Sequence, residues 1–94
     1  MKIKDIQARD TGYTKTDEKS ISRIGSEIEF YAQPTVGASM LLSYVKDNQG
    51  NPKIGLVRTS AVINVIEDDI EIIVVTLNSR YVFEKTNEVK GEDV

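Results

Sequence analysis

The sequence predicts an all-β protein with five to six strands, either a small antiparallel barrel of the SH3-like or OB-like type or a compact β-sandwich. Three observations support this fold class. Apolar and polar residues alternate in several short stretches, and turn-forming residues separate these stretches at intervals of about ten residues. No stretch shows a sustained helical period. A chain of 94 residues is long enough for one domain.

The clearest prediction is a β-hairpin over residues 69–83. Five of the six residues from Ile70 to Val75 are Ile or Val, whose branching at Cβ favours an extended backbone. Thr76-Leu77-Asn78-Ser79 then supplies turn-forming side chains. Tyr81 and Phe83 alternate with their neighbours in the returning strand. We therefore expect two adjacent strands joined by a tight turn.

The N-terminal part of the chain is predicted to be less ordered. Residues 2–6 alternate and are typical of a short edge strand protected by lysines. The following polar stretch is interpreted as a long loop or a mobile arm, with at most one helical turn at residues 17–19. Residues 1–20 are therefore assigned to an N-terminal arm.

The β domain is predicted over residues 21–86, followed by an acidic tail over residues 87–94 that we expect to fray. Its first strands are residues 27–33, with Ile28, Phe30 and Ala32 facing inward, and residues 38–46. Residues 47–52 should form a hairpin loop. Residues 53–66 are long for one strand, so we expect a bend or bulge near residues 59–61.

Two of the predicted strands, residues 38–46 and 70–77, are apolar on both faces. A strand of this kind is covered on both sides, either by a second layer of its own chain or by another subunit. The residues expected at such a subunit interface are Leu41, Val45, Ile73 and Val75. The sequence therefore predicts a homo-oligomer.

Composition excludes several kinds of chemistry. The chain has neither cysteine nor histidine, so thiol nucleophiles, disulfides and imidazole acid–base catalysis are absent. It contains no phosphate-binding glycine loop, no nucleophile elbow and no spacing typical of a transition-metal site. We therefore expect a protein that is not an enzyme and has no cofactor and no bound metal. Without a signal peptide or an apolar run of about 20 residues, we expect it in the cytoplasm, with no membrane partner.

The net charge of −3 is unevenly distributed. Residues 1–26 carry six Lys or Arg against four acidic residues, whereas residues 27–94 carry six against eleven. The basic residues of the first segment offer an alternative function, an OB-like module for single-stranded nucleic acid. They are Lys2, Lys4, Arg9, Lys15, Lys19 and Arg23. An acidic chain binds nucleic acid poorly, and only Tyr31 among the strand aromatics is expected to face outward, so we consider this alternative the weaker one.

Two short polar clusters stand out in the apolar half of the chain, and their positions allow them to converge at one end of a barrel. Their hydroxyl, amide and guanidinium groups suit a backbone or a polar ligand. The predicted binding residues are Arg58, Thr59, Ser60, Asn78, Ser79 and Arg80. In the competing interpretation these residues close a turn and cap a bulge. The two arginines would then pair with Glu29 or Glu84 across strands.

An acidic cluster lies where the long segment of residues 53–66 leads into the predicted hairpin of residues 69–83. It consists of Glu67, Asp68, Asp69 and Glu71. We interpret it as a solvated turn whose charge deters aggregation. Binding of a hard cation, or mimicry of nucleic-acid phosphates toward a host protein, are the alternatives.

A motif pattern spans residues 25–83. It reads Gly-x-Glu-x-x-Phe, Thr-Ser-x-Val and Thr-x-Asn-Ser-x-Tyr-x-Phe, and its residues are Gly25, Glu27, Phe30, Thr59, Ser60, Val62, Thr76, Asn78, Ser79, Tyr81 and Phe83. This order resembles a group of short, uncharacterised proteins encoded by phages and prophages of low-GC Gram-positive bacteria. The resemblance implies a viral accessory protein acting in the host cytoplasm, and it carries over no catalytic residues.

The predicted function is therefore a non-enzymatic binding protein that engages a host or phage macromolecule. The expected partner is a protein, and inhibition of a host factor or defence system would suit the viral origin that the resemblance implies. A small-ligand-binding β oligomer is a further alternative, beside the nucleic-acid module.

Overall fold

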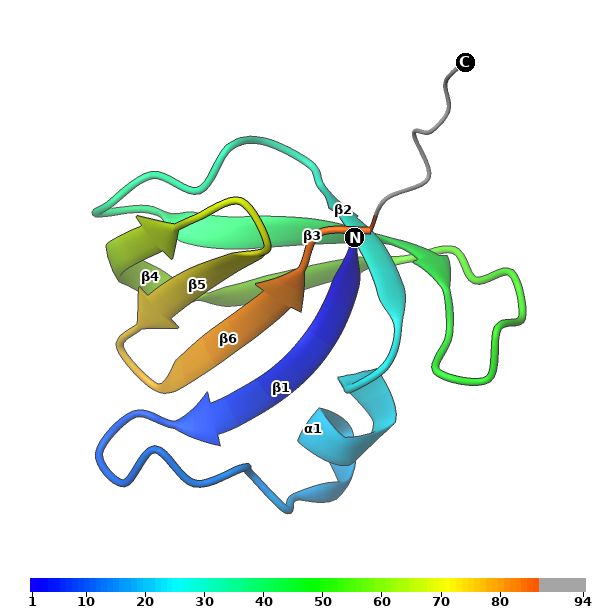
Figure 1. The fold of residues 1–94 in the computed structure, drawn as a ribbon, viewed down its shortest axis with the longest axis horizontal. Helices are drawn as coiled ribbons and strands as arrows, with labels where there is room; N and C mark the ends of the chain where they lie inside the picture. Colours follow the sequence, from blue (N-terminus) through cyan, green and yellow to red (C-terminus); the bar gives the residue numbers. More distant parts are fainter. Residues whose placement is uncertain (87–94) are drawn as a thin grey trace.

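Six strands form one antiparallel sheet that closes on itself into a barrel (Figure 1). The structure is a computed structural model, and it describes residues 1–86. In chain order the elements are β1 (Lys2–Ala8), α1 (Glu18–Arg23), β2 (Glu27–Phe30), β3 (Ser39–Lys46), β4 (Leu56–Glu67), β5 (Glu71–Thr76) and β6 (Ser79–Glu84). The predicted small antiparallel barrel is therefore confirmed. The acidic tail expected over residues 87–94 lies outside the described residues.

Neighbouring strands in the barrel are also neighbours along the chain, and antiparallel pairing of β6 with β1 closes the ring. The topology is thus a meander, without the Greek-key connection that defines an OB barrel. Closure gives each strand a neighbour on both sides along part of its length, which limits the exposed edge available for edge-to-edge aggregation. The predicted hairpin of residues 69–83 is confirmed as β5 and β6.

The first strand closes the barrel. β1 pairs with β6 from Lys2 to Ala8 and meets β2 at Glu27. The amino group of Met1 donates a hydrogen bond to the carbonyl oxygen of Ile28 at 3.0 Å, which strengthens the short β1–β2 contact. The edge strand expected for residues 2–6 was therefore wrong, because β1 has a neighbour on each side and belongs to the same sheet as the rest of the domain.

Alternation along each strand sends one set of side chains into the barrel. The fully buried apolar core comprises Ile3, Ile6, Ile28, Met40, Leu42, Val57, Val62, Val74 and Phe83. The Phe83 ring is at the centre of an aromatic group, with the Phe30 ring edge-on at 5.2 Å and the Tyr81 ring stacked at 6.1 Å. Burial of these side chains is the main favourable term for the fold.

A bulge in β4 allows this strand to pair with β3 along its first part and with β5 along its second part. Leu41 of β3 pairs with Arg58, but Ser39 pairs with Ala61, so β4 contains one extra residue between them. The hydroxyl of Thr59 accepts a hydrogen bond from the backbone N–H of Met40 at 3.0 Å and holds this irregular point. The bend predicted near residues 59–61 is therefore confirmed. Beyond it, β4 leaves β3 and continues along β5.

The connection between β1 and β2 contains a helix that is longer than the single turn predicted at residues 17–19. α1 has six residues, and the Asp17 side chain caps it by accepting a hydrogen bond from the backbone N–H of Ser20 at 3.1 Å. Ser20 is buried and Ile24, just beyond the helix, packs against the core. Tertiary packing therefore stabilises a helix too short to persist alone. No helix within residues 1–86 is long and apolar enough to cross a membrane.

Two strand ends differ from the prediction. β2 ends at Phe30, so Ala32 is exposed rather than inward-facing. β4 begins at Leu56 rather than at residue 53. The hairpin loop at residues 47–52 forms as expected, with the Asp47 carboxylate accepting hydrogen bonds from the backbone N–H groups of Gln49 and Asn51 at 2.9 Å each.

Candidate functional site

The two polar clusters singled out in the sequence meet at one end of the barrel. Ser60 lies at the β4 bulge and Asn78 lies in the turn between β5 and β6. The hydroxyl oxygen of Ser60 accepts a hydrogen bond from the backbone N–H of Asn78 at 3.2 Å. Beside it, the backbone N–H of Leu77 donates to the carbonyl oxygen of Ala61 at 3.0 Å. The structure thus brings together residues that are 18 positions apart in the chain.

At this end of the barrel, the buried hydroxyl groups form hydrogen bonds with backbone groups. The Thr76 hydroxyl accepts a hydrogen bond from the backbone N–H of Ser79 at 3.1 Å and lies 3.2 Å from the Ser79 carbonyl oxygen. Thr59 is likewise buried and holds the β4 bulge. For Thr59 and Ser79, the structure therefore supports the interpretation that these residues shape a bulge and a turn.

The N-terminal segment adds two cations that sequence reasoning did not place here. An Arg9 guanidinium nitrogen donates to the carbonyl oxygen of Leu77 at 3.2 Å, and the Lys15 ammonium group donates to the hydroxyl of Ser79 at 2.8 Å. Arg9 directly follows β1, whose last residue pairs with Ser79 of β6. The Lys15 contact needs the segment to fold back along β1, which it does through a turn at Gly12 with φ +77°. The sequence feature that could have indicated this fold-back is the Asp10-Thr11-Gly12 triplet, because these residue types favour a turn.

Hydrogen bonds along β1 hold this returning segment in place. The backbone N–H of Ala8 donates to the carbonyl oxygen of Tyr13, and that of Lys15 donates to the carbonyl oxygen of Ile6, both at 2.8 Å. Of the two interpretations offered for this polar stretch, a long loop or a mobile arm, the structure shows a loop with a defined position. Its backbone groups find partners on β1, and this pairing gives the polar segment a defined position.

An open depression lies against this end of the barrel. It has a volume of about 580 Å³ and is lined by Arg9, Asp10, Leu77 and Asn78. All four residues are exposed. The lining offers guanidinium and carboxamide donors, a carboxylate acceptor and an apolar side chain. Such a mixture suits the polar surface of a macromolecule better than catalysis, which needs a positioned nucleophile or acid–base pair.

Tyr81 of β6 is buried, and its hydroxyl lies near polar groups of α1 and of the β5–β6 turn. Burial raises the pKa of Tyr81, and the Arg23 guanidinium and the Ser79 hydroxyl act on it in the opposite direction. The phenol therefore stays neutral at physiological pH.

The two arginines of the predicted binding set lie on different outer faces of the barrel. The register places Arg58 beside Leu41 of β3, and Arg80 between Gln7 of β1 and Val75 of β5. The Nε atom of Arg80 is buried and has no hydrogen-bond partner among the described residues. Neither arginine therefore belongs to the surface formed by Ser60 and Asn78.

The expected pairing of these arginines with glutamates was wrong. Within residues 1–86 the ion pairs are Lys4–Glu71 and Lys85–Glu67. The register explains the difference, because Glu29 lies opposite Ser43 and Glu84 lies opposite Glu71.

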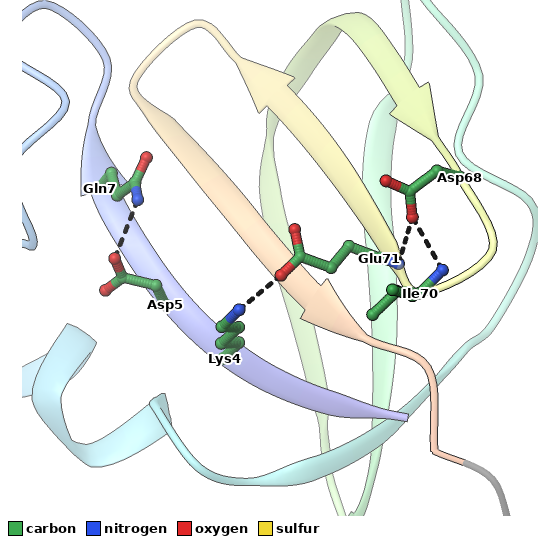
Figure 2. Close-up of polar contacts among 6 residues, drawn as sticks. All are labelled: Lys4, Asp5, Gln7, Asp68, Ile70 and Glu71. Atoms are coloured by element: carbon green, nitrogen blue, oxygen red, sulfur yellow. Dashed lines mark hydrogen bonds and ion pairs between the residues drawn. The ribbon is translucent and has the colours of Figure 1, made fainter.

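The acidic cluster between β4 and β5 forms hydrogen bonds and ion pairs within this chain. The Asp68 carboxylate accepts hydrogen bonds from the backbone N–H groups of Ile70 and Glu71 at 2.8 Å each (Figure 2). These donors, that of Glu71 first, hold the pKa of Asp68 below its ordinary value. Glu71 also pairs with Lys4, and Glu67 pairs with Lys85. Across the described part of the chain, no three acidic residues are arranged to hold a metal ion.

The features proposed for nucleic-acid binding are occupied by other contacts. Of the six N-terminal cations, Lys4, Arg9 and Lys15 contact groups of this chain. The Tyr81 and Phe83 rings stack on each other inside the core. The Lys53 ammonium group covers the Tyr44 ring at 4.2 Å from its centroid. A stacking platform on the barrel surface would need several exposed aromatic rings, so this alternative loses support.

No known protein family matches this chain, and neither a curated protein nor a solved structure matches it. The resemblance to phage and prophage proteins therefore remains a prediction from the sequence. A functional assignment depends on the geometry of the described residues.

Proposed function

We propose that this chain is a non-enzymatic binding protein that engages a protein partner through one end of its barrel. We call this surface the polar end and define it by Arg9, Asp10, Ser60, Leu77 and Asn78. The hydrogen bond between the Ser60 hydroxyl and the Asn78 backbone carries the proposal, because it joins the β4 bulge to the β5–β6 turn. Pre-organised surfaces of this kind lose little entropy on binding.

The chemistry of the polar end supports recognition of a polar segment of a protein. Ser60 holds Asn78 through the backbone N–H, and the exposed Asn78 side chain adds a carboxamide with two donors and one acceptor. The Arg9 guanidinium has donors beyond the one used on the Leu77 carbonyl oxygen. Leu77 contributes apolar area, since its side chain is exposed. Carboxylate groups and backbone carbonyl groups of a partner would satisfy these donors.

A host macromolecule is the partner that the sequence resemblance favours. A phage accessory protein without catalytic groups acts by occupying a surface of its target, and inhibition of a host factor or defence system is one such action. The open shape of the depression supports a macromolecule over a small ligand, because small-ligand pockets enclose most of the ligand surface.

Affinity capture with matched variants tests this proposal. Tagged protein is incubated with an extract of the host cell, and captured proteins are identified and purified. The test variant is Arg9→Ala with Asn78→Ala. The control is Lys46→Ala with Asn48→Ala, which likewise removes one cation and one carboxamide, at exposed positions of β3 and the β3–β4 loop. Calorimetric titration with the purified partner should show affinity unchanged in the control and weakened by about tenfold or more in the test variant.

Equal affinity of both double variants for the purified partner would contradict the proposal. Capture that disappears after nuclease treatment would instead favour the nucleic-acid alternative. Circular dichroism and urea midpoints of both variants establish that any loss of affinity is not caused by unfolding.

A further inference from the structure

The outer surface of three adjacent strands exposes apolar side chains that the chain itself does not cover. We call it the β3 face. Its members point outward from β3, from β4, and from β2 and the residue that follows β2. They are Glu29, Tyr31, Leu41, Val45, Leu56 and Arg58. The same strands send Ile28, Leu42 and Val57 into the core, so alternation makes β3 and β4 largely apolar on both sides.

The register defines how these side chains are arranged. One row across the face is Tyr31, Leu41 and Arg58, because the Tyr31 backbone N–H donates to the Leu41 carbonyl oxygen at 3.0 Å and Leu41 pairs with Arg58. The next row contains Glu29 and Leu56, on either side of Ser43. The face is thus acidic along β2, apolar in the centre and basic along β4.

Large apolar side chains of this face are exposed on both sides of β3. Leu56 is 59 % exposed and Tyr31 is 67 % exposed, whereas Leu41 and Val45 of β3 are half-buried. On the outer face of β5 and β6, Val82 is buried and Ile73 and Val75 are half-buried, while Ile66 beside them on β4 is exposed. Contiguous exposed apolar surface of this kind marks an interaction site.

The charged side chains at the β2 and β4 margins of the β3 face indicate which partner binds there. Glu29 lies on β2 and Arg58 on β4, with β3 between them, so they are about 10 Å apart across the sheet. Neither forms an ion pair among residues 1–86. A second copy of the same chain can place its Arg58 at the margin of Glu29 and its Glu29 at the margin of Arg58. An unrelated partner would need a basic and an acidic residue of its own at both matching positions.

We propose that the β3 face binds a second copy of this chain in a two-fold symmetric dimer. A two-fold axis parallel to β3 lays β4 of each copy over β2 of the other. Arg58 of one copy then reaches the margin where Tyr31 and Glu29 of the other copy lie, and can contact the ring and the carboxylate. Leu41, Val45 and Leu56 form the apolar centre. This inference does not depend on the proposed function, because the β3 face and the polar end share no residue.

Charge reversal tests the proposal with an outcome that a merely structural role would not produce. Native mass spectrometry and sedimentation are measured on the full chain. The wild-type protein should dimerise, whereas Arg58→Glu and Glu29→Arg should each weaken association by about tenfold or more, because like charges then oppose each other across the axis. Mixing the two variants should restore a dimer that contains one copy of each, since both contacts then join opposite charges.

Substitutions on the two outer faces identify the surface. Leu56→Asp should abolish the dimer, and Ile66→Asp, at an exposed apolar position where β4 runs beside β5, should leave it intact. Circular dichroism confirms that each variant is folded. A wild-type monomer at all concentrations, loss of the dimer with Ile66→Asp alone, or failure of the mixed variants to associate would overturn the proposal.

Discussion

Lys4 of β1 forms an ion pair with Glu71 of β5, although β6 lies between these two strands (Figure 2). The pairing is made possible by a bulge, since Ile3 pairs with Phe83 and Asp5 pairs with Val82, which leaves Lys4 as the extra residue. Val82 points to the outer face beneath this contact and is nevertheless buried. Because Val82 pairs with Asp5, the residue after Lys4, we expect the apolar stem of the lysine to cover this side chain on the outside of the barrel.

Two variants of Lys4 separate the role of its charge from that of its stem. Lys4→Met keeps the apolar stem and should lower the free energy of unfolding only slightly, because the ion pair is largely exposed to solvent. Lys4→Ala should lower it further by uncovering Val82. Urea unfolding of both variants measures the difference, with Glu71→Gln completing a double-mutant cycle. Equal stability of the two variants would show that the stem does not contribute, and a coupling energy near zero would show that the ion pair does not.

The aromatic group in the core is expected to dominate stability. Phe83→Ala removes a fully buried ring that contacts the Phe30 and Tyr81 rings, so it should cost about 3–5 kcal/mol and leave a cavity. Tyr13→Ala removes an exposed ring and should change stability by no more than about 0.5 kcal/mol. Chemical denaturation provides both values. A loss below that of the Tyr13 variant would mean that Phe83 is not at the centre of the core.

The β4 bulge depends on one hydroxyl group. Thr59→Val conserves shape but leaves the buried N–H of Met40 without its acceptor, so we expect a loss of about 1–3 kcal/mol. Thr59→Ser keeps the oxygen and should retain most of that stability. Hydrogen exchange at Met40 should accelerate in the valine variant only. If the serine variant is the less stable of the two, then the methyl group and not the hydrogen bond holds the bulge.

Three aspartates predict loss of stability in acid. Backbone or side-chain donors at Asn51, Glu71 and Ser20 hold the pKa values of Asp47, Asp68 and Asp17, respectively, below their ordinary values. A carboxyl group with a lower pKa in the folded state stabilises the fold above its unfolded pKa, and this contribution is lost as the pH falls through the folded pKa. Urea midpoints should therefore be constant near neutral pH and fall below about pH 4.

Replacing one of these carboxylates checks the assignment. Asp68→Asn should reduce the steepness of the acid transition, because the residue no longer titrates. Asp69→Asn is the matched control, since Asp69 is exposed and accepts neither hydrogen bond of the β4–β5 turn. An identical change in both variants would show that general charge repulsion, and not the turn, controls the acid transition.

The sequence by itself determined the strands, because alternation and β-branching act locally. The hairpin of β5 and β6, the loop after β3 and the β4 bulge were all predicted from neighbouring residues. Convergence of Ser60 and Asn78 also followed from this pattern, since the strand that contains the bulge pairs with the strand that ends at the turn.

Only the tertiary structure decided how the barrel closes and where the side chains of Arg9 and Lys15 lie. The prediction of an edge position for β1 was wrong because its partner, β6, is more than 70 residues away. No local feature of the sequence identifies a partner so distant in the chain. The positions of Arg9 and Lys15 depend on that same closure, which folds the following segment along β1. Local pattern specifies which face of a strand is buried, whereas long-range register specifies which side chains from different strands meet.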